Sequence, residues 1–311
     1  MRSKCLYCYE PLTGEGTFHQ KCSLKIFGTP EPPVIPYELD EMSELAKRVV
    51  ERSVSLPGVQ PKLSMESLSD SQENRLTIVG ALHGQYIFKP PSSHYPEMPE
   101  NEHLTMRLAE IFGIPVVPSS LITLKSGELS YITKRIDRFQ DGEKIHMLDM
   151  FQITEAFDKY TGSYERIGKA IAKFSDRTVL DKVYFFDLCL FSFISGNNDM
   201  HLKNFSMIKS ESGWILAPAY DLLNVAIVLP EDKEDLALTL CGKKKRLALR
   251  HFELLAQSMK LTNKQIRNSF ERLLKSKGSA EVLIENSFLS DEMKVAYKEL
   301  LRERYRRLEL A

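Results

Sequence analysis

The sequence predicts an α+β protein of two lobes, a small β-rich lobe followed by a larger and mostly helical one. Short apolar segments separated by turn residues occupy residues 76–133, a pattern typical of strands. From about residue 146 onward, apolar residues recur at three- and four-residue spacing, which indicates helices. Three cysteines and a histidine within the first 22 residues predict an N-terminal knuckle. The predicted domains are the knuckle at 1–30, the β-rich lobe at 31–139 and the helical lobe at 140–311.

Composition excludes several classes of protein. The 311 residues are 43% hydrophobic, which is enough for two lobes that share a cleft, and the net charge is zero, so no overall field favours nucleic acid or membrane. The longest apolar run, Val183–Ile194, contains Asp187 and is too short to span a bilayer. The N-terminus lacks the apolar segment of a signal peptide. Five cysteines do not form a disulfide framework, and we expect Cys189 and Cys241 to be core residues. We therefore expect a cytoplasmic protein.

Four residues near the N-terminus have the spacing of zinc ligands. Two residues separate Cys5 from Cys8 and His19 from Cys22, and ten residues separate the two pairs. Thiolates and an imidazole from two short turns suit tetrahedral Zn²⁺. Free cysteines and an unrelated histidine in a small hydrophobic tip are the alternative. Because protein ligands fill all four positions, the predicted zinc is structural.

The β-rich lobe begins with a proline-rich linker at residues 30–36 and a short helix from about Glu41 to Glu51. In the next segment, Ser53–Leu63, small residues can bring backbone amides close to phosphates, although a plain turn at Pro57-Gly58 explains the pattern equally well. A turn is expected at His83-Gly84. The predicted strands are Leu76–Ala81, Gln85–Lys89, Val116–Leu124 and Glu128–Thr133.

A lysine and a glutamate of this lobe are candidates for nucleotide binding. Lys89 ends an apolar strand, where an ammonium group can hold phosphates, although a solvated strand end is the commoner setting for a lysine. A helix predicted at about residues 100–112 carries Glu102, which can pair with Lys89. Residues 134–139 form the predicted crossing between the lobes, where backbone groups are available to an adenine edge.

The helical lobe also contains two basic segments. Lys243–Arg246 is expected to be a solvated loop, with a nucleic-acid patch as the alternative. The arginines of the final helix, Arg302, Arg304, Arg306 and Arg307, are expected to form a solvated face. The predicted elements of this lobe are helices at Met150–Phe157, Tyr164–Phe174 and Asp176–Phe193, a strand at Trp214–Pro218, and helices beginning at Phe252, Asn263 and Asp291.

The polar stretch 196–204 follows the third of these helices. It contains Asp199 and, five positions later, Asn204, and Asp221 comes after a further apolar segment. Phosphoryl transfer needs one carboxylate to orient and deprotonate a hydroxyl, and an amide with a second carboxylate to hold Mg²⁺. The Asp-x4-Asn spacing matches a phosphotransfer loop, here with His201 inside it. A polar turn whose side chains bond their own backbone is the alternative.

Several motifs occur in the same order in one known family. They are Ser55-Leu56-Pro57-Gly58-Val59-Gln60-Pro61-Lys62, Phe88-Lys89-Pro90, Asn101-Glu102, Lys134-Arg135-Ile136-Asp137-Arg138, the stretch 196–204 and Tyr220-Asp221. In these motifs the chain resembles HipA-family serine/threonine kinases, the toxins of bacterial toxin–antitoxin modules, over roughly residues 45–300. Its length resembles the short HipT-type members. The resemblance implies a two-lobed, protein-kinase-like (HipA-like) fold.

The resemblance also implies roles for individual residues. Asp199 would be the catalytic base, and Asn204 and Asp221 would hold Mg²⁺. Ser55 would be the loop serine that is autophosphorylated, with Ser53 as a second candidate. The chain departs from the family at Pro57, where some HipT-type proteins have another serine, and at Lys134, where HipA has a glutamate. The residues implied to bind ATP are Lys89, Lys62, Ser55, Gly58, Glu102 and His201.

The implied activity is ATP-dependent phosphorylation of a serine or threonine, with an aminoacyl-tRNA synthetase as the expected target. The implied partners are a HipB-like DNA-binding antitoxin, through which DNA is contacted only indirectly, and a HipS-like small protein. No membrane partner is expected. Two alternatives stay open. One is a phosphotransferase for a small molecule, and the other is a non-catalytic interaction module with the same fold.

Overall fold

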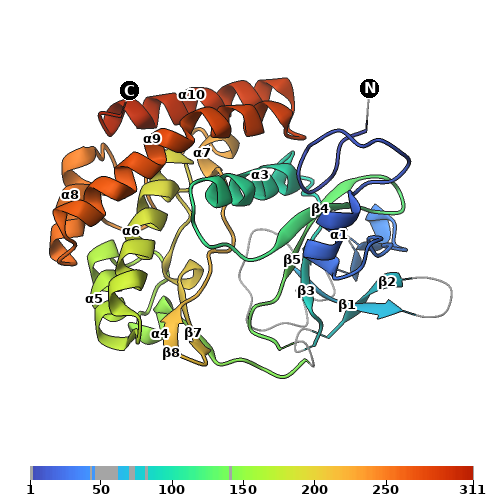
Figure 1. Cartoon of the computed structure of the whole chain (residues 1–311), viewed down its shortest axis with the longest axis horizontal. Helices are drawn as coiled ribbons and strands as arrows, with labels where there is room; N and C mark the ends of the chain where they lie inside the picture. Colours follow the sequence, from blue (N-terminus) through green and yellow to red (C-terminus); the bar gives the residue numbers. More distant parts are fainter. Residues whose placement is uncertain are drawn as a thin grey trace. The chain divides into compact units, whose positions relative to one another are not determined.

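Figure 1 shows the computed structural model of the chain, which describes residues 3–42, 44–45, 62–69, 74–80, 83–139 and 142–310. The chain divides into two compact units. The first comprises Met1–His103, Val117–Lys144 and Asn286–Phe288, and the second comprises Leu104–Val116, Ile145–Glu285 and Leu289–Ala311. The first unit carries a sheet and the knuckle, and the second is mostly helical, so the predicted α+β class is confirmed.

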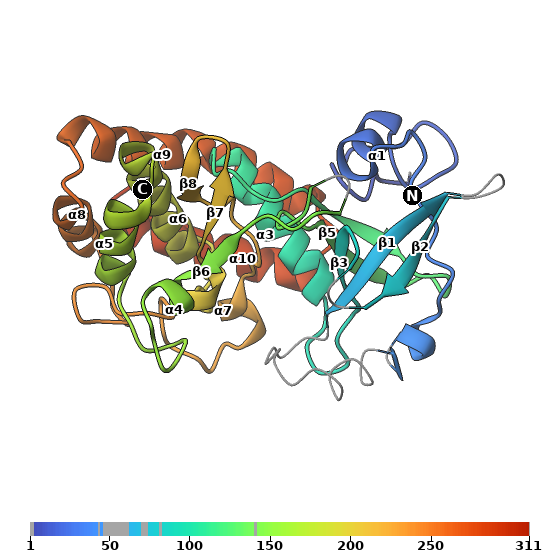
Figure 2. The same ribbon diagram turned by 90° about the horizontal axis from the view of Figure 1, so that it is seen from below.

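The first unit contains a five-stranded antiparallel sheet (Figure 2) with the strand order β2-β1-β3-β5-β4. Its core includes Met65, Leu76, Phe88 and Ile132, all fully buried. The helices of this unit include α1 (Gln20–Phe27) and the start of α3 (Met98–Ile111), inside which the boundary between the units falls, and residues 39–42 and 44–45 are also helical. The strands are β1 (Leu63–Ser69), β2 (Asn74–Val79), β3 (Tyr86–Lys89), β4 (Ser119–Thr123) and β5 (Leu129–Lys134).

The four predicted strands are confirmed within a few residues, but β1 was not predicted. Its apolar alternation, Leu63 and Met65, stops at Ser67, so the sequence lacks a regular strand pattern there. The predicted turn at Gly84 is confirmed. Gly84 has φ +89°, and a Cβ there would lie 2.7 Å from the Met65 carbonyl oxygen, so only glycine fits. Most of the predicted helix Glu41–Glu51 lies outside the described residues.

The second unit is built around α6 (Thr178–Ile194), which contacts α5, α8, α10 and β8. Most of the side chains between Phe185 and Ile194 are buried, because helices cover α6 on several sides. A three-stranded antiparallel sheet has the order β6-β7-β8 (Figure 2). The other elements are β6 (Met147–Asp149), α4 (Met150–Ile153), α5 (Tyr164–Phe174), η1 (Leu202–Asn204), β7 (Ser206–Ser210), β8 (Gly213–Leu216), α7 (Val225–Val228), α8 (Leu249–Ser258), α9 (Asn263–Asn286) and α10 (Asp291–Arg307).

Two carboxylates at the start of α6, the buried Asp181 and the exposed Asp176, attach the small sheet to that helix. The Asp181 carboxylate is 1% exposed and accepts hydrogen bonds from the Ser175 hydroxyl at 2.6 Å and from the Leu216 backbone N–H at 2.8 Å. Asp176 accepts a hydrogen bond from the Trp214 backbone N–H at 2.6 Å. These bonds fix β8 against the start of α6, and β8 pairs in turn with β7, which directly follows the predicted catalytic stretch.

Several predictions for this unit were wrong in detail. The helix predicted at Met150–Phe157 ends at Ile153, and β6 and β7 were not predicted. Cys189 is buried as expected, whereas Cys241 is exposed, because it lies in a surface turn. Within the described residues, no helix combines the length and hydrophobicity that crossing a bilayer requires.

The prediction of a solvated arginine face on α10 is correct for Arg302 and Arg306 but wrong for the other two arginines. Arg304 is 6% exposed, Arg307 is half-buried, and both guanidinium groups bind the carboxylate of Asp235. Asp235 also accepts a hydrogen bond from the Leu247 backbone N–H at 2.9 Å. Helix periodicity places these arginines on the buried side of α10, where a partner from a distant segment compensates their charge.

We expect Asp235→Asn to lower the free energy of unfolding by about 3 kcal/mol, because it deprives two partly or fully buried guanidinium groups of the buried carboxylate that they share. Urea denaturation measures this. Glu281→Gln is the control, because it removes the exposed 3.0 Å ion pair with Arg302 and should cost less than about 1 kcal/mol. Equal losses in both variants would contradict the prediction.

The ion pairs of Asp235 with Arg304 and Arg307 should also make the free energy of unfolding depend on pH. Burial alone would raise the pKa of Asp235, but Arg307 and Arg304 lower that pKa below its ordinary value. The stabilisation is therefore fully present above the unfolded-state pKa of about 3.9. It is lost as the pH falls from there through the depressed pKa of the folded state.

Candidate active site and metal centre

The candidate catalytic loop begins where α6 ends. Gly196 has φ +69°, and a Cβ there would lie 2.4 Å from the Leu300 side chain and 2.6 Å from Oδ1 of Asn224. Glycine is therefore required for the tight turn. The Asn197 backbone N–H then bonds to the carbonyl oxygen of Ser192 at 2.9 Å. This turn directs the chain from the buried helix into the stretch that contains Asp199.

Two amide side chains hold the loop closed. Nδ2 of Asn204 donates to the backbone carbonyl oxygen of Asp199 at 3.0 Å, and the Asp199 backbone N–H donates to Oδ1 of Asn197 at 3.3 Å. Asn197 is fully buried and Asn204 is 6% exposed. Since the nitrogen of the Asn204 amide is engaged, its oxygen is the atom that can ligate a cation. The Asp-x4-Asn spacing thus forms a rigid loop that presents one carboxylate and one amide oxygen.

Tyr220 holds Asp221 near this loop. The Tyr220 hydroxyl donates to the carbonyl oxygen of Lys203 at 3.0 Å and shares a 2.6 Å hydrogen bond with Ser206, on either side of Asn204. Asp221 has φ +59°, a left-handed conformation that is uncommon for residues other than glycine. Such backbone strain often occurs at functional sites. The fold therefore attaches the residue that precedes Asp221 to the chain on both sides of Asn204.

His201 belongs to the same loop, two positions after Asp199. It is 6% exposed, and burial lowers its pKa below the ordinary value, although the Asp199 and Asp221 carboxylates act in the opposite direction. The neutral imidazole is therefore favoured near pH 7. Both carboxylates lie within electrostatic reach of this one ring. The structure thus brings together four residues that the sequence singled out in this unit, Asp199, His201, Asn204 and Asp221.

Tyr160, which no sequence pattern indicated, also contacts the candidate base. Its hydroxyl donates to Oδ1 of Asp199 at 2.8 Å, and its ring packs edge-on against His201 with centroids 5.0 Å apart. Burial and the Asp199 carboxylate raise the pKa of Tyr160 far above its usual value, so the hydroxyl stays a donor. Tyr160 is 39 positions from Asp199 and lies in an irregular segment, so no local pattern could identify it.

We expect Tyr160→Phe to reduce phosphoryl transfer about tenfold, because a hydrogen bond to a charged group contributes about 1.5–3 kcal/mol to holding that group in place. Steady-state kinetics and thermal unfolding would measure the effect, and the unfolding temperature should change little. Thr161→Val is the control, because the Thr161 hydroxyl bonds to Asp158 in the same segment. Equal activity in the two variants would show that Tyr160 does not orient Asp199.

In the first unit, the predicted pairing of Lys89 with Glu102 is confirmed. The Lys89 ammonium lies 2.6 and 2.8 Å from the two carboxylate oxygens of Glu102, and the residues are 4% and 2% exposed. The ammonium also lies 5.3 Å from the centroid of the Tyr131 ring, which is opposite Lys89 in the sheet. Lys89 is therefore a buried, paired cation at the end of β3, and the alternative of a solvated strand end is wrong.

The predicted phosphate loop is described only at its end. Lys62 is half-buried and immediately precedes β1. Ser53, Ser55 and Gly58 lie outside the described residues. Their roles in ATP binding and autophosphorylation therefore stay predictions.

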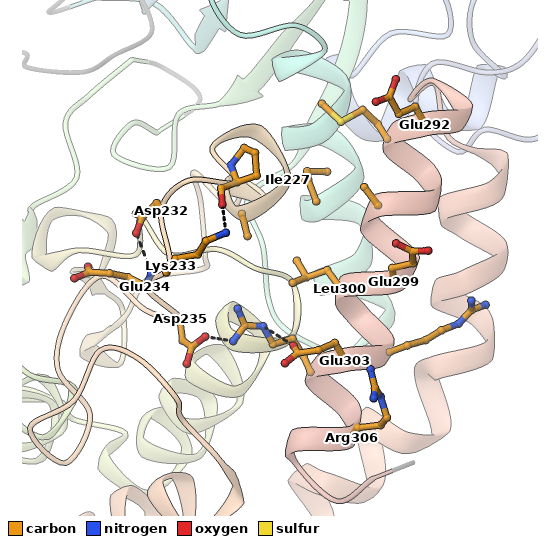
Figure 3. A pocket seen from close by; sticks show the side chains of 16 residues that line it. Ile227, Asp232, Lys233, Glu234, Asp235, Glu292, Glu299, Leu300, Glu303 and Arg306 are labelled. Carbon is orange, nitrogen blue, oxygen red and sulfur yellow. Dashed lines mark hydrogen bonds and ion pairs between the residues drawn. The ribbon is translucent and has the colours of Figure 1, made fainter.

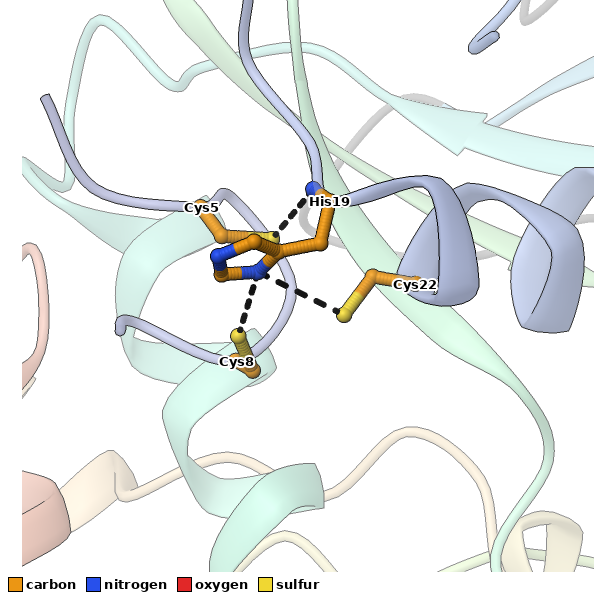
Figure 4. Close-up of side chains that lie close together, drawn as sticks. All are labelled: Cys5, Cys8, His19 and Cys22. Atoms are coloured by element: carbon orange, nitrogen blue, oxygen red, sulfur yellow. Dashed lines mark hydrogen bonds between the residues drawn. The ribbon is translucent and has the colours of Figure 1, made fainter. Parts of the chain in front are cut away.

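The four predicted zinc ligands converge (Figure 4). The ligand atoms of Cys5, Cys8, His19 and Cys22 all lie within 4.8 Å of one another. Nδ1 of His19 is 3.3 Å from Sγ of Cys8 and 4.0 Å from Sγ of Cys22. Bonds of about 2.3 Å to sulfur and 2.0 Å to nitrogen in a tetrahedron require separations of about this size. The residues therefore fit Zn²⁺.

The surroundings of the cluster support a cation. Nε2 of His19 lies 3.2 Å from the carbonyl oxygen of Pro11, which favours a proton on Nε2 and leaves Nδ1 available as a ligand. Burial and the neighbouring Cys5 and Cys8 sulfurs raise the pKa of Cys22 to about 12. A divalent cation reverses this repulsion, since it stabilises coordinated thiolates. The donor set is typical of a closed structural zinc site.

Figure 3 shows a separate groove in the second unit, between α10 and residues 226–235. Lys233, Glu299 and Glu303 line it, and the buried Asp235–Arg304 pair forms part of its wall. Charged residues of both signs line the groove. None of the predicted catalytic or metal-binding residues lies there, so the groove is distinct from the loop that carries Asp199.

The HipA-like C-terminal domain model matches residues 54–280. "Putative kinase Y4dM" of Sinorhizobium fredii is 34% identical over 245 residues, which cover 73% of this chain and 59% of that protein. The serine/threonine-protein kinase toxin HipA of Shewanella oneidensis is 26% identical over 193 residues, which cover 55% of this chain and 43% of that toxin. The chain thus spans about half the length of these curated relatives.

A solved complex of Shewanella oneidensis HipA, HipB and operator DNA contains a chain with the same fold. The TM-score is 0.67 and the identity is 22%, and the match covers 89% of this chain and 72% of that one. The domain match spans the segment that contains Lys89, Glu102, Asp199, Asn204 and Asp221. This chain belongs to the family of proteins with a HipA-like C-terminal domain.

Proposed function

We propose that this protein is an ATP- and Mg²⁺-dependent serine/threonine protein kinase. The observation that carries the proposal is the closed loop in which Asn204 binds the backbone of Asp199, with Asp221 held nearby through Tyr220. A buried lysine–glutamate pair in the other unit supplies the second element that phosphoryl transfer needs. The kinase names of the relatives agree with this chemistry.

In the proposed mechanism, Asp199 accepts the proton of a serine or threonine hydroxyl. The hydroxyl oxygen then bonds to the γ-phosphorus of ATP, while the bond from that phosphorus to the β-phosphate oxygen breaks and ADP leaves. The Asn204 amide oxygen and the Asp221 carboxylate would hold Mg²⁺, which neutralises charge on the phosphates. Lys89, oriented by Glu102, would bind the phosphates of ATP, with Lys62, Gly58, Ser55 and His201 also near the nucleotide.

We further propose that the kinase is a toxin of a HipT-type toxin–antitoxin module. Its target would be an aminoacyl-tRNA synthetase, and its partners a HipB-like antitoxin and a HipS-like small protein. The similar solved complex, which holds HipA together with HipB and operator DNA, supports a DNA-binding antitoxin. Ser55, with Ser53 as a second candidate, would be autophosphorylated and silence the enzyme, because added charge beside bound phosphates repels them.

Intact-mass analysis after incubation with Mg-ATP tests the proposal. We expect a gain of one phosphate that maps to Ser55 and is absent from Asp221→Asn. A protein that neither gains phosphate nor binds nucleotide would be an interaction module instead. Nucleotide binding without phosphate gain, together with transfer to a small molecule such as an aminoglycoside, would identify the alternative phosphotransferase.

A further inference from the structure

The zinc cluster lies next to a direct connection to the helix that carries Glu102. The hydroxyl of Tyr9, the residue after the ligand Cys8, shares a 2.8 Å hydrogen bond with Nδ1 of His103. His103 follows Glu102 on α3. Tyr9 is 2% exposed and His103 is fully buried, so the bond is shielded from water. The hydrogen bond therefore joins Tyr9, which is next to the predicted metal ligand Cys8, to His103. His103 is next to Glu102, the partner of Lys89.

The turn of the metal site fixes the position of Tyr9. Tyr9 has φ +65°, its backbone N–H bonds to the Cys5 carbonyl oxygen at 3.0 Å, and the Cys5 N–H bonds to the Glu10 carbonyl oxygen at 2.9 Å. This strained turn carries both Cys5 and Cys8. The hydrophobic cluster of the knuckle is small, so apolar burial alone stabilises the turn little. A metal ion bound by the cluster would supply that stabilisation.

Further contacts attach the same turn to its surroundings in the first unit. The Tyr9 ring packs edge-on against His103 at 5.3 Å and against Phe288 at 5.6 Å. The Tyr7 ring lies 6.1 Å from His103. The Lys4 ammonium donates to the Asn286 carbonyl oxygen at 3.1 Å. The turn therefore contacts α3 at His103 through the rings of Tyr7 and Tyr9, and the Tyr9 hydroxyl makes the hydrogen bond of this contact.

We propose that the zinc knuckle positions the Lys89–Glu102 pair, with Tyr9 and His103 as the positioning residues. Metal bound by Cys5, Cys8, His19 and Cys22 keeps Tyr9 in place, and Tyr9 holds His103 and the first turns of α3. Glu102 then meets Lys89 at the end of β3. The effect on nucleotide affinity rests on the proposed kinase function, whereas the effect on the order of α3 does not.

Tyr9→Phe in the full-length, zinc-loaded protein tests the connection, because it removes one hydroxyl and keeps the ring. We expect one zinc per chain as in the wild type, faster hydrogen–deuterium exchange over residues 98–103, and a Kd for a non-hydrolysable Mg-ATP analogue about three- to tenfold higher. Tyr7→Phe is the matched control. Its hydroxyl accepts a hydrogen bond from Lys25 on α1, so exchange over residues 98–103 should stay unchanged.

Removal of zinc by a chelator, or Cys8→Ser, should reproduce the faster exchange over residues 98–103. Unchanged exchange in zinc-loaded Tyr9→Phe, or equal exchange of the metal-free and zinc-loaded wild type, would overturn the proposal. A wild-type protein that binds no nucleotide, but whose α3 exchange still responds to Tyr9→Phe, would contradict the kinase function and leave the coupling intact. The two failures are therefore distinguishable.

Discussion

Asp199→Asn is expected to reduce kcat for phosphoryl transfer by a factor of about 10²–10⁴, the usual contribution of a general base. The substitution keeps the size of the side chain, and the amide can still interact with Tyr160. What it removes is the negative charge that accepts the substrate proton. Because Asn204 binds the backbone of residue 199 and not its side chain, the loop should stay closed.

Single-turnover kinetics with radiolabelled ATP would measure this loss, and calorimetry should show a nearly unchanged Kd for Mg-ATP. Asp291→Asn is the control for charge, because its side chain is fully exposed on α10 and should leave kcat unaltered. Full activity of Asp199→Asn would exclude this residue as the base. A large loss of nucleotide affinity would instead assign Asp199 to nucleotide binding.

Lys89→Met is expected to abolish detectable phosphoryl transfer and to destabilise the protein by about 3–5 kcal/mol. The destabilisation arises because Glu102 would be left buried with its charge uncompensated. The loss of activity comes from the missing ammonium group, whereas the loss of stability comes from the unpaired carboxylate of Glu102. A second substitution, at Glu102, separates the two effects.

The double variant Lys89→Met/Glu102→Leu removes the buried charge and should recover most of the lost stability, since apolar residues of similar size often replace a buried ion pair at little cost. It should not recover activity, because no ammonium group is left to bind phosphates. Urea denaturation and a kinase assay on both single variants and the double variant complete the double-mutant cycle. Restored activity in the double variant would contradict a direct role for Lys89.

The strands and helices with regular patterns were predictable from the sequence. β2, β3, β4, β5, α5 and α6 follow local apolar periodicity, and α9 and α10 begin at the predicted residues. Elements without that pattern were missed, among them β1, whose alternation stops at Ser67, and the short strands β6 and β7. β6 pairs with β7, which lies about 60 positions further along the chain, so no local signal identifies it. β1 and β7 pair with the strands that follow them, and they were missed because their sequences lack a sustained apolar alternation.

The candidate sites divide in the same way. Spacing along the chain predicted the convergence of Cys5, Cys8, His19 and Cys22 and the Asp199–Asn204 loop, because short turns bring residues that are close in sequence close together in space. The sequence suggested that Glu102 can pair with Lys89 but could not show the contact. The contact depends on how α3 packs against β3.

The sequence by itself therefore determined the fold class, the Cys/His cluster and the loop that joins Asp199 to Asn204, because local periodicity and short spacings encode them. Only the tertiary structure decided the burial of Arg304 against Asp235, the hydrogen bond from Tyr160 to Asp199 and the connection from Tyr9 to His103. Each of these contacts joins residues at least 39 positions apart. Their formation depends on the packing of whole elements, which no residue pattern records.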